Sequence, residues 1–131
     1  MRALLDTHIW LWGQLDPDRL GPSLRRRLED ERTELWLSPV SLWETILLAE
    51  KGRLRLEPSP EAWVEERLRI TPMREAVLDR RVAVASRRVD LGHDDPADRF
   101  LAATAAVYDL TLVTADARLL ASGSMQVLAN H

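Results

Sequence analysis

The 131-residue chain predicts an α/β fold, with helices on both faces of a central parallel sheet of about five strands, which makes a three-layer α/β/α domain. Two observations lead to this fold class. Short apolar runs typical of buried strands alternate with longer segments that have helical start signals and apolar spacing. The connections are short clusters rich in Pro, Gly, Asp and Ser, with no linker and no internal repeat. We therefore expect residues 1–131 to form a single domain.

The first third of the chain predicts two strands and two helices. Arg2–Asp6 contains the apolar run of a buried strand, and Thr7–Leu15 has apolar residues around much of its circumference, which favours a packed helix. Turn residues at Asp16–Asp18 end that helix. A polar helix is expected over Pro22–Arg32, and a short strand over Glu34–Ser38, where Leu-Trp-Leu stands at the centre.

The middle of the chain predicts a helix that begins at Ser38-Pro39 or at Ser41 and runs to Lys51, where Gly52 supplies a C-terminal stop. After it we expect, in order, an extended stretch at Arg53–Leu56, a helix from Pro58-Ser59-Pro60 to about Leu68, a weak edge-strand candidate at Ile70–Met73 and a helix over Arg74–Arg88.

The last third predicts a loop, two helices and two strands. Leu91–Asp94 is the loop, and Asp95 with Pro96 opens a helix that ends near Tyr108, because an acidic N-cap followed by proline is a typical helix start. The elements expected after it are a strand at Leu110–Thr114, a short helix at Ala117–Leu120 and a strand at Met125–Leu128.

Composition excludes several classes of protein. There is no cysteine, so disulfides, thiolate zinc sites and cysteine nucleophiles are absent. The longest apolar runs are too short to span a bilayer, and we expect a soluble, cytoplasmic protein without membrane contact. The net charge of −3 gives no general attraction to nucleic acid, yet Lys51 is the only lysine among 18 basic residues. Arginine clusters such as Arg25–Arg27 suit phosphate, although they also occur as solvated helix faces.

Four acidic residues stand at equivalent points of the predicted fold. Asp6 and Asp116 each follow a strand directly, while Glu44 and Asp98 lie near the starts of helices. In a parallel α/β sheet, ligands bind outside the carboxyl ends of the strands, where the strand order reverses. Several acids that converge there repel one another unless a divalent cation neutralises them, so the pattern indicates hard-metal chemistry. Each acid taken singly is also explained by helix capping or by the helix dipole, and Asp95 is the expected N-cap of its helix.

The histidines and tryptophans give weaker signals. No histidine pair has the spacing of a zinc site. We expect His8 to be a packed residue on an apolar helix and His93 to be a local hydrogen-bonding residue. The five tryptophans are expected mainly in the core, but Trp10 and Trp12 cannot both face inward on one helix, so one of them marks a partner surface.

Several strings resemble those of PIN-domain proteins, and within that family the VapC toxins of bacterial toxin–antitoxin pairs. The strings are Leu4–Trp10, Ser38–Glu44, Lys51–Leu54, Asp95–Arg99 and Leu112–Asp116. The resemblance spans nearly the whole chain, in order. It implies a PIN-like domain in which Asp6, Glu44, Asp98 and Asp116 are catalytic acids that hold Mg²⁺ or Mn²⁺.

The resemblance also assigns supporting residues and partners. Thr7 and Thr114 match flanking hydroxyl positions, Asp95 is an outer acid, and Arg99 matches a basic position without an assigned role. It implies a homodimer and a cognate VapB-like antitoxin that occupies a groove over the first helices and the active site. Trp10, Trp12 and the segment Arg25–Arg27 are candidates for contacts in these interfaces.

The function that follows is hydrolysis of RNA phosphodiester bonds by metal-activated water. Two alternatives belong to other classes. A haloacid-dehalogenase-like phosphotransferase also places an aspartate after its first strand, but it needs a second aspartate two residues later, where this chain has His8. A non-enzymatic regulatory module predicts no metal binding at all.

Overall fold

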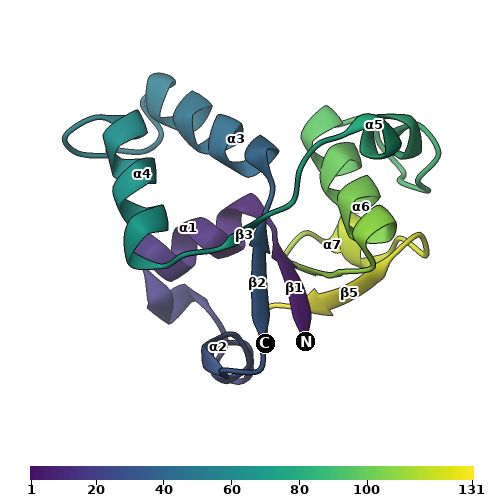
Figure 1. Ribbon diagram of the computed structural model, residues 1–131, viewed down its shortest axis with the longest axis horizontal. Helices are drawn as coiled ribbons and strands as arrows, with labels where there is room; N and C mark the ends of the chain where they lie inside the picture. Colours follow the sequence, from purple (N-terminus) through teal and green to yellow (C-terminus); the bar gives the residue numbers. More distant parts are fainter.

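The computed structural model describes residues 1–131 and contains a five-stranded sheet in which every neighbouring pair of strands is parallel (Figure 1). The strand order is β3-β2-β1-β4-β5. The strands are β1 (Arg2–Leu5), β2 (Glu34–Leu37), β3 (Arg74–Glu75), β4 (Thr111–Thr114) and β5 (Gln126–Ala129). The predicted fold class, with a parallel sheet of about five strands, is confirmed.

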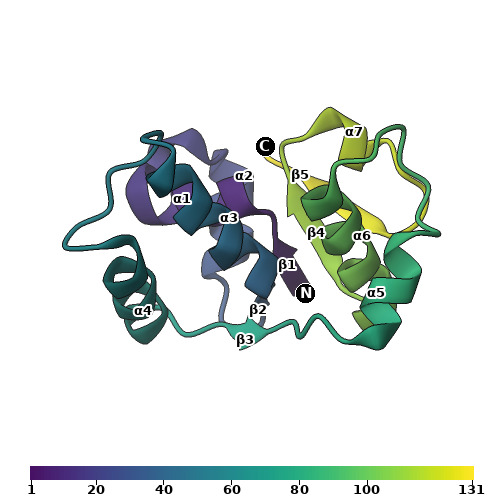
Figure 2. The same ribbon diagram turned by 90° about the horizontal axis from the view of Figure 1, so that it is seen from above.

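Helices cover both faces of this sheet. Alternation along β1 shows the layering: Ala3 and Leu5 belong to one apolar cluster, and Leu4 belongs to the other. The first group, which packs on the Leu5 side, is α1 (Thr7–Leu15), the 3₁₀ turn η1 (Pro17–Arg19), α2 (Pro22–Glu29), α3 (Pro39–Glu50) and α4 (Pro60–Ile70). The second group, which packs on the Leu4 side, is α5 (Arg80–Ser86), α6 (Pro96–Tyr108) and α7 (Ala117–Leu120). Figure 2 shows the two groups on either side of the sheet.

Three predicted elements differ from the structure. The edge strand lies at Arg74–Glu75 instead of Ile70–Met73, because α4 continues to Ile70 and proline prevents pairing before Met73. The helix predicted from Arg74 begins only at Arg80, where Asp79 caps it by accepting a hydrogen bond from the Val82 N–H. The α2 helix ends at Glu29, three residues before the predicted end.

The tryptophan prediction was correct only in part. Trp10 and Trp63 are core residues, with exposed fractions of 1% and 7% and an edge-to-face contact of 5.7 Å between ring centroids. Trp43 on α3 is 59% exposed, so it does not belong to the core. Trp12 is half-buried. Of the two tryptophans on α1, Trp12 is therefore the more exposed.

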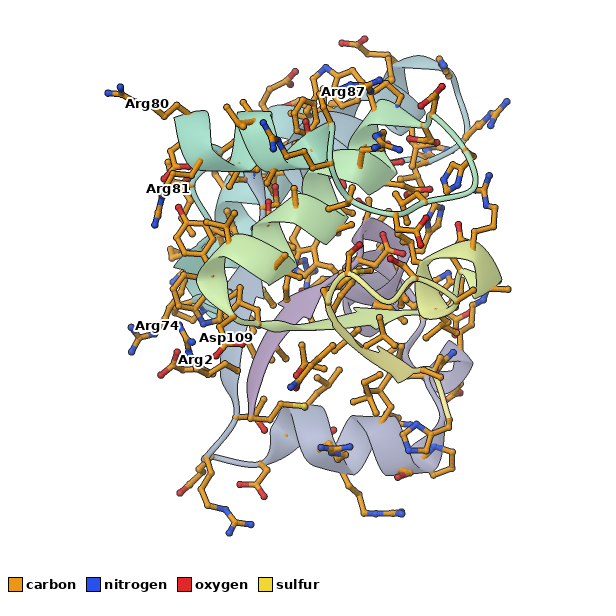
Figure 3. The ribbon with its side chains drawn as sticks, turned by 90° about the vertical axis from the view of Figure 1, so that its right-hand side faces the viewer. Arg2, Arg74, Arg80, Arg81, Arg87 and Asp109 are labelled. Carbon is orange, nitrogen blue, oxygen red and sulfur yellow. The ribbon has the colours of Figure 1, made fainter.

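The first residue of β1 ties the sheet to the end of α6. Arg2 donates hydrogen bonds to the carbonyl oxygens of Tyr108 and Asp109, at 3.1 and 3.3 Å, and Figure 3 shows Arg2 beside Asp109. Asp109 ends α6 in the left-handed conformation with φ of 55°. The contact satisfies carbonyl groups that the end of the helix leaves without partners.

The strand order reverses between β1 and β4. The chain runs from β1 outward through β2 and β3, then returns to the other side of β1 to form β4 and β5. Leu5 pairs with Val113, and the Asp6 N–H donates to the Val113 carbonyl oxygen at 2.9 Å. The residues that follow these two strands therefore meet at a switch point, which is where ligands bind in such sheets. None of the helices combines the length and apolar character needed to cross a bilayer.

Candidate metal-binding active site

The four acids predicted as site residues line one pocket at the carboxyl ends of β1 and β4. The pocket has a volume of about 240 Å³. Its lining residues are Asp6, His8, Trp12, Glu44, Asp98, Ala115 and Asp116. The structure thus brings together two residues that follow strands and two that lie on helices α3 and α6. Asp95 does not line this pocket.

Asp6 is buried and held by uncharged donors. As the N-cap of α1, it accepts a hydrogen bond from the Thr7 N–H to Oδ1 at 2.7 Å. The Thr114 hydroxyl donates to its other oxygen, Oδ2, at 2.6 Å. Burial raises the pKa of Asp6 above its ordinary value, and these two hydrogen bonds oppose that rise. No arginine or lysine pairs with the carboxylate, so its charge is not compensated by the chain.

Glu44 is held by the hydroxyl of Thr7, the residue whose backbone N–H holds Asp6. The Thr7 hydroxyl donates to Glu44 Oε1 at 2.6 Å and lies 3.0 Å from Ser41 Oγ. Ser38 caps the start of α3 by accepting from the Val40 N–H, and this places Ser41 and Glu44 on the first turns, facing α1. Thr7 therefore serves two acids: its backbone N–H holds Asp6 and its side chain holds Glu44.

Asp98 is held by His93. The Nε2 atom of His93 lies 2.8 Å from Asp98 Oδ2, and both side chains are about 15% exposed. Burial raises the pKa of Asp98, and the His93 hydrogen bond opposes that rise. The expected cap is present as well, because Asp95 Oδ1 accepts from the Asp98 N–H at 3.2 Å. His93 is a local hydrogen-bonding residue, as predicted. Its partner is the pocket acid Asp98.

A buried arginine holds the segment that carries His93. Arg99 is 7% exposed and donates to the carbonyl oxygens of Ser86, Val89 and His93 at 2.8, 3.0 and 3.2 Å. These bonds close the connection between α5 and α6 around one guanidinium. Arg99 lies outside the pocket, and its effect on the site passes through His93 to Asp98.

Asp116 is paired with Arg118. It caps α7 by accepting from the Arg118 N–H at 2.8 Å, and the Arg118 guanidinium lies 3.1 Å from Asp116 Oδ2. Hydrogen bonds from that guanidinium hold the pKa of Asp116 below its ordinary value. The same guanidinium lies 3.6 Å from Asp98 Oδ2, so it bridges two of the four acids.

His8 was predicted as a packed residue, and this prediction is wrong. It is exposed and lines the acidic pocket, 6.1 Å from the Trp12 ring between centroids. The apolar spacing of the helix correctly identifies Ile9, Trp10 and Leu11 as buried. The apolar spacing does not show, however, that the first turn of α1 lies at the edge of the sheet beside the acidic pocket, where the His8 side chain faces the pocket.

The donor set of the pocket suits a hard divalent cation. Carboxylate oxygens are the ligands that Mg²⁺ and Mn²⁺ prefer, and the pocket offers four such groups with no thiol and no imidazole pair. As the side chains lie here, no group of three or more converges closely enough to hold one ion. Arg118 accounts for part of this arrangement, since it draws Asp98 and Asp116 toward itself.

Sequence reasoning did not identify Arg118, His8 or the link between Arg99 and His93. The spacing Asp116-Ala117-Arg118 at a helix start is a usable signal for the first, because an N-cap and the side chain two residues later lie on the same end of the helix. No comparable signal exists for the Arg99 contacts, which depend on the path of a connection between two helices.

Comparison with known proteins gives a consistent result. Residues 3–122 match the family model described as PIN domain. Ribonuclease VapC22 of Mycobacterium tuberculosis is 33% identical over 120 residues, which cover 89% of this chain and 88% of the relative.

Solved structures share the fold at lower sequence identity. VapBC2 from Rickettsia felis bound to a promoter DNA fragment has a TM-score of 0.72 and 14% identity, and the match covers 98% of each chain. DNA-bound VapBC from Salmonella typhimurium has a TM-score of 0.68 and 20% identity, over 100% of this chain and 99% of the other.

Proposed function

The chain belongs to the PIN domain family, and on this premise we propose that it is a divalent-metal-dependent endoribonuclease and the toxin of a VapBC-type toxin–antitoxin pair. The observation that supports the chemistry is the gathering of Asp6, Glu44, Asp98 and Asp116 in one pocket at the switch point of the sheet. The ribonuclease relative supports RNA as the substrate. Neither a phosphotransferase nor a non-enzymatic module has comparable support.

In this proposal the four carboxylates hold Mg²⁺ or Mn²⁺. When bound, such an ion supplies a hydrolytic nucleophile at neutral pH and stabilises charge at the scissile phosphodiester. Thr7 and Thr114 keep Glu44 and Asp6 oriented toward the pocket without cancelling their charge. His93 orients Asp98 through its contact at 2.8 Å. Arg118, which is 57% exposed and lies near both Asp98 and Asp116, would give up these contacts where the two carboxylates hold an ion.

The first test is cleavage of single-stranded RNA by the purified protein with added Mn²⁺, compared with Asp6→Asn. We expect a loss of activity of about a thousandfold or more, since removal of one member of a group that acts as a unit abolishes most of its effect. Asp18→Asn is the matched control, because Asp18 is 95% exposed and lies outside the pocket, and its activity should be unchanged. Cleavage that persists in Asp6→Asn, or in EDTA, contradicts the proposal.

A stability measurement separates loss of function from loss of fold. Because burial raises the pKa of Asp6, the folded state binds the proton more tightly than the unfolded chain does. The stability that this group contributes is therefore lost as the pH rises from the pKa of Asp6 in the unfolded chain through its raised pKa in the folded protein. Once the Asp6 carboxyl group is ionised, its burial costs stability, and the uncharged Asn side chain avoids that cost. We expect Asp6→Asn to melt at a higher temperature than the unmodified protein in EDTA, and to gain less stability from Mn²⁺.

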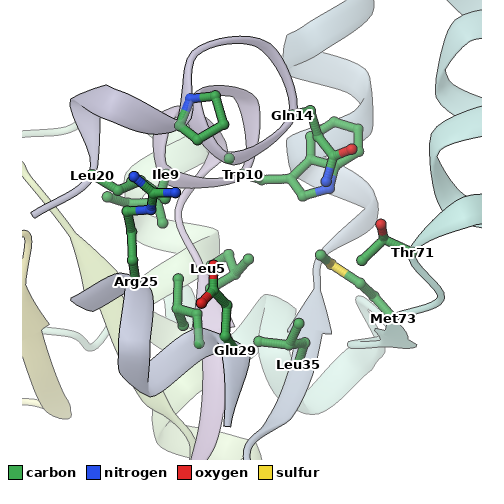
Figure 4. Close-up of a pocket in the computed structure, with 13 residues that line it drawn as sticks. Leu5, Ile9, Trp10, Gln14, Leu20, Arg25, Glu29, Leu35, Thr71 and Met73 are labelled. Atoms are coloured by element: carbon green, nitrogen blue, oxygen red, sulfur yellow. The ribbon is translucent and has the colours of Figure 1, made fainter. Parts of the chain in front are cut away.

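The partners and the cellular location belong to the same proposal. We propose a homodimer in the cytoplasm that is neutralised by a VapB-like antitoxin, supported by the VapBC complexes with the same fold. A cavity of about 280 Å³ between α1, α2 and the segment that follows α4 is suited to receive an antitoxin segment. Figure 4 shows its apolar floor at Leu5, Ile9 and Trp10, with Arg25 and Glu29 of α2 at the rim. Co-expression with any small reading frame found immediately upstream of the gene, followed by measurement of the complex mass, tests this assignment.

A further inference from the structure

A second pocket adjoins the acidic pocket and shares two of its residues. Its volume is about 300 Å³, and His8 and Trp12 line both cavities. The shared pair places the two cavities next to each other at the first turns of α1. The remainder of the second pocket comes from the end of α1, the η1 turn, the end of α3 and the residues that follow α3. The second pocket is therefore close enough to contact a part of the substrate that extends beyond the acidic pocket.

The chemistry of the second pocket is opposite to that of the first. Two arginines line it, Arg19 and Arg53, against one carboxylate, Asp16. Both arginines are exposed, and neither forms an ion pair. The rest of the lining is apolar and consists of Trp12 with Leu11, Leu15, Leu48 and Leu54. Leu15 is 46% exposed, which leaves part of this apolar wall uncovered by the chain itself.

The backbone holds both arginines in place. Gly52 has φ of +74°, and the N–H groups of Gly52 and Arg53 donate to the carbonyl oxygens of Ala49 and Leu48. This pair of bonds is a Schellman motif, which ends α3 and directs Arg53 and Leu54 onto the pocket wall. Arg19 is fixed from the other end of the chain, since the Asn130 side chain donates to its carbonyl oxygen at 2.9 Å.

Trp12 is suited to stacking. The Arg19 guanidinium lies 4.4 Å from the centroid of the Trp12 ring, and the His8 ring lies 6.1 Å away at a tilt of 56°. Bases of single-stranded RNA are bound by stacking on aromatic rings and on arginine planes, while arginines hold the adjoining phosphates. An acidic pocket alone repels the phosphates on either side of the bond to be cut, so a nuclease of this kind needs cationic groups nearby.

We infer that this second pocket is a nucleotide subsite: it binds the base and phosphate of a single-stranded RNA residue next to the scissile phosphate. Trp12 with Arg19 stacks the base, Arg19 and Arg53 hold the phosphates, and the leucines shield the ring from water. The inference rests on the proposed nuclease function, because it assigns a substrate contact to that same active site.

The test is the affinity for a short, fluorescently labelled single-stranded RNA, measured by anisotropy in EDTA so that no cleavage occurs. Arg19→Gln combined with Arg53→Gln should weaken binding by at least about tenfold, and should lower the slope of log affinity against log salt by roughly 0.7 for each phosphate that the variant no longer binds. Arg80→Gln is the matched control, since Arg80 is an exposed arginine at the start of α5, outside both pockets, and Figure 3 shows it pointing into solvent. It should change affinity by less than about twofold.

A second arm isolates the base. The experiment uses a set of RNAs in which one base is missing, at a different position in each. In the unmodified protein, one of these RNAs should bind roughly 5- to 100-fold less tightly than the others, because its missing base is the one that stacks in the subsite. Trp12→Leu should abolish that positional difference. Unchanged RNA affinity in the double variant, or an equal loss in Arg80→Gln, overturns the inference.

The controls distinguish this inference from the proposed function. If the unmodified protein cleaves RNA with Mn²⁺ and the double variant cleaves and binds equally well, only the subsite is wrong. If the unmodified protein cleaves no RNA, the proposed nuclease function is wrong, and the subsite that rests on it is wrong as well. Sedimentation of the metal-free variants provides the remaining outcome: a changed association state with unchanged RNA affinity assigns the pocket to a contact between copies of the chain, and overturns the inference.

Discussion

Asp6 and Glu44 are held by hydroxyl and backbone donors, whereas Asp98 and Asp116 are held by an imidazole and a guanidinium. The first pair has no counter-ion in the chain, because a hydroxyl or backbone N–H orients a carboxylate without supplying a positive charge. The second pair is partly neutralised by Arg118, which contacts both carboxylates. One pocket thus contains two acids that lack a counter-ion and two that already have one.

The difference shows how the chain tolerates four acids without a bound cation. Like charges at close range raise the free energy of the folded state, and burial adds to that cost at Asp6. Arg118 reduces the repulsion between the carboxylates of Asp98 and Asp116. An ion pair near the surface contributes only up to about 1 kcal/mol, so little stability is lost when this contact is broken. Single substitutions can separate the hydroxyl-held side, Asp6 and Glu44, from the cation-held side, Asp98 and Asp116.

Thr114→Val should have the largest effect among such substitutions, on the hydroxyl-held side. Valine matches the shape of threonine but removes the donor to Asp6 and the acceptor for the Asp116 N–H. Loss of a group that orients a metal ligand lowers affinity or activity by about 10- to 100-fold. We also expect the free energy of unfolding in Mn²⁺ to fall by about 1.5–3 kcal/mol, since the missing bond is to a buried charged group.

Two measurements check this prediction: the kcat/KM for RNA cleavage and the urea unfolding midpoint. Thr114→Ser retains a hydroxyl at the same position and should restore most of both quantities. If the valine and serine variants behave alike, the Thr114 hydroxyl has no part in orienting Asp6, and the proposed difference between the hydroxyl-held side and the cation-held side is contradicted.

His93→Ala tests the cation-held side and should lower Mn²⁺ affinity by about tenfold. The change leaves Asp98 without its partner at 2.8 Å, so its carboxylate must be ordered by the ion itself. Isothermal titration with Mn²⁺ measures the affinity directly. His131→Ala is the matched control, because His131 is an exposed histidine after β5 that does not line the pocket, and the Mn²⁺ affinity of this variant should be unchanged.

The sequence identified the sheet and the two strand-end acids for a physical reason. Strands and their carboxyl ends follow from apolar runs, so Asp6 and Asp116 can be placed together from the sequence alone. Glu44 and Asp98 lie within the first turns of their helices, and their direction depends on how α3 and α6 rotate against the sheet, so the family resemblance was needed for them.

The errors have a similar origin. The two-residue strand β3 is too short to carry an alternating pattern, and it forms because Trp36 and Leu37 of β2 offer an edge with which Arg74 and Glu75 pair. His8 follows an apolar helical pattern but faces the pocket. In both cases the outcome is decided by neighbouring elements rather than by the local residues, which sequence patterns alone do not report.

Arg118→Gln should have the smallest effect, with the opposite sign. Glutamine keeps the length and polarity of the side chain but removes the charge that bridges Asp98 and Asp116. A metal ion then displaces no internal cation when it binds, so Mn²⁺ affinity should rise by about two- to fivefold, the range that corresponds to an exposed ion pair. Added salt screens the same pair, and at high ionic strength the affinities of variant and unmodified protein should therefore converge. A fall in affinity at all salt concentrations would instead mean that Arg118 orders the two carboxylates for the ion, and the cation-held side would then act as a positioning device like the hydroxyl-held side.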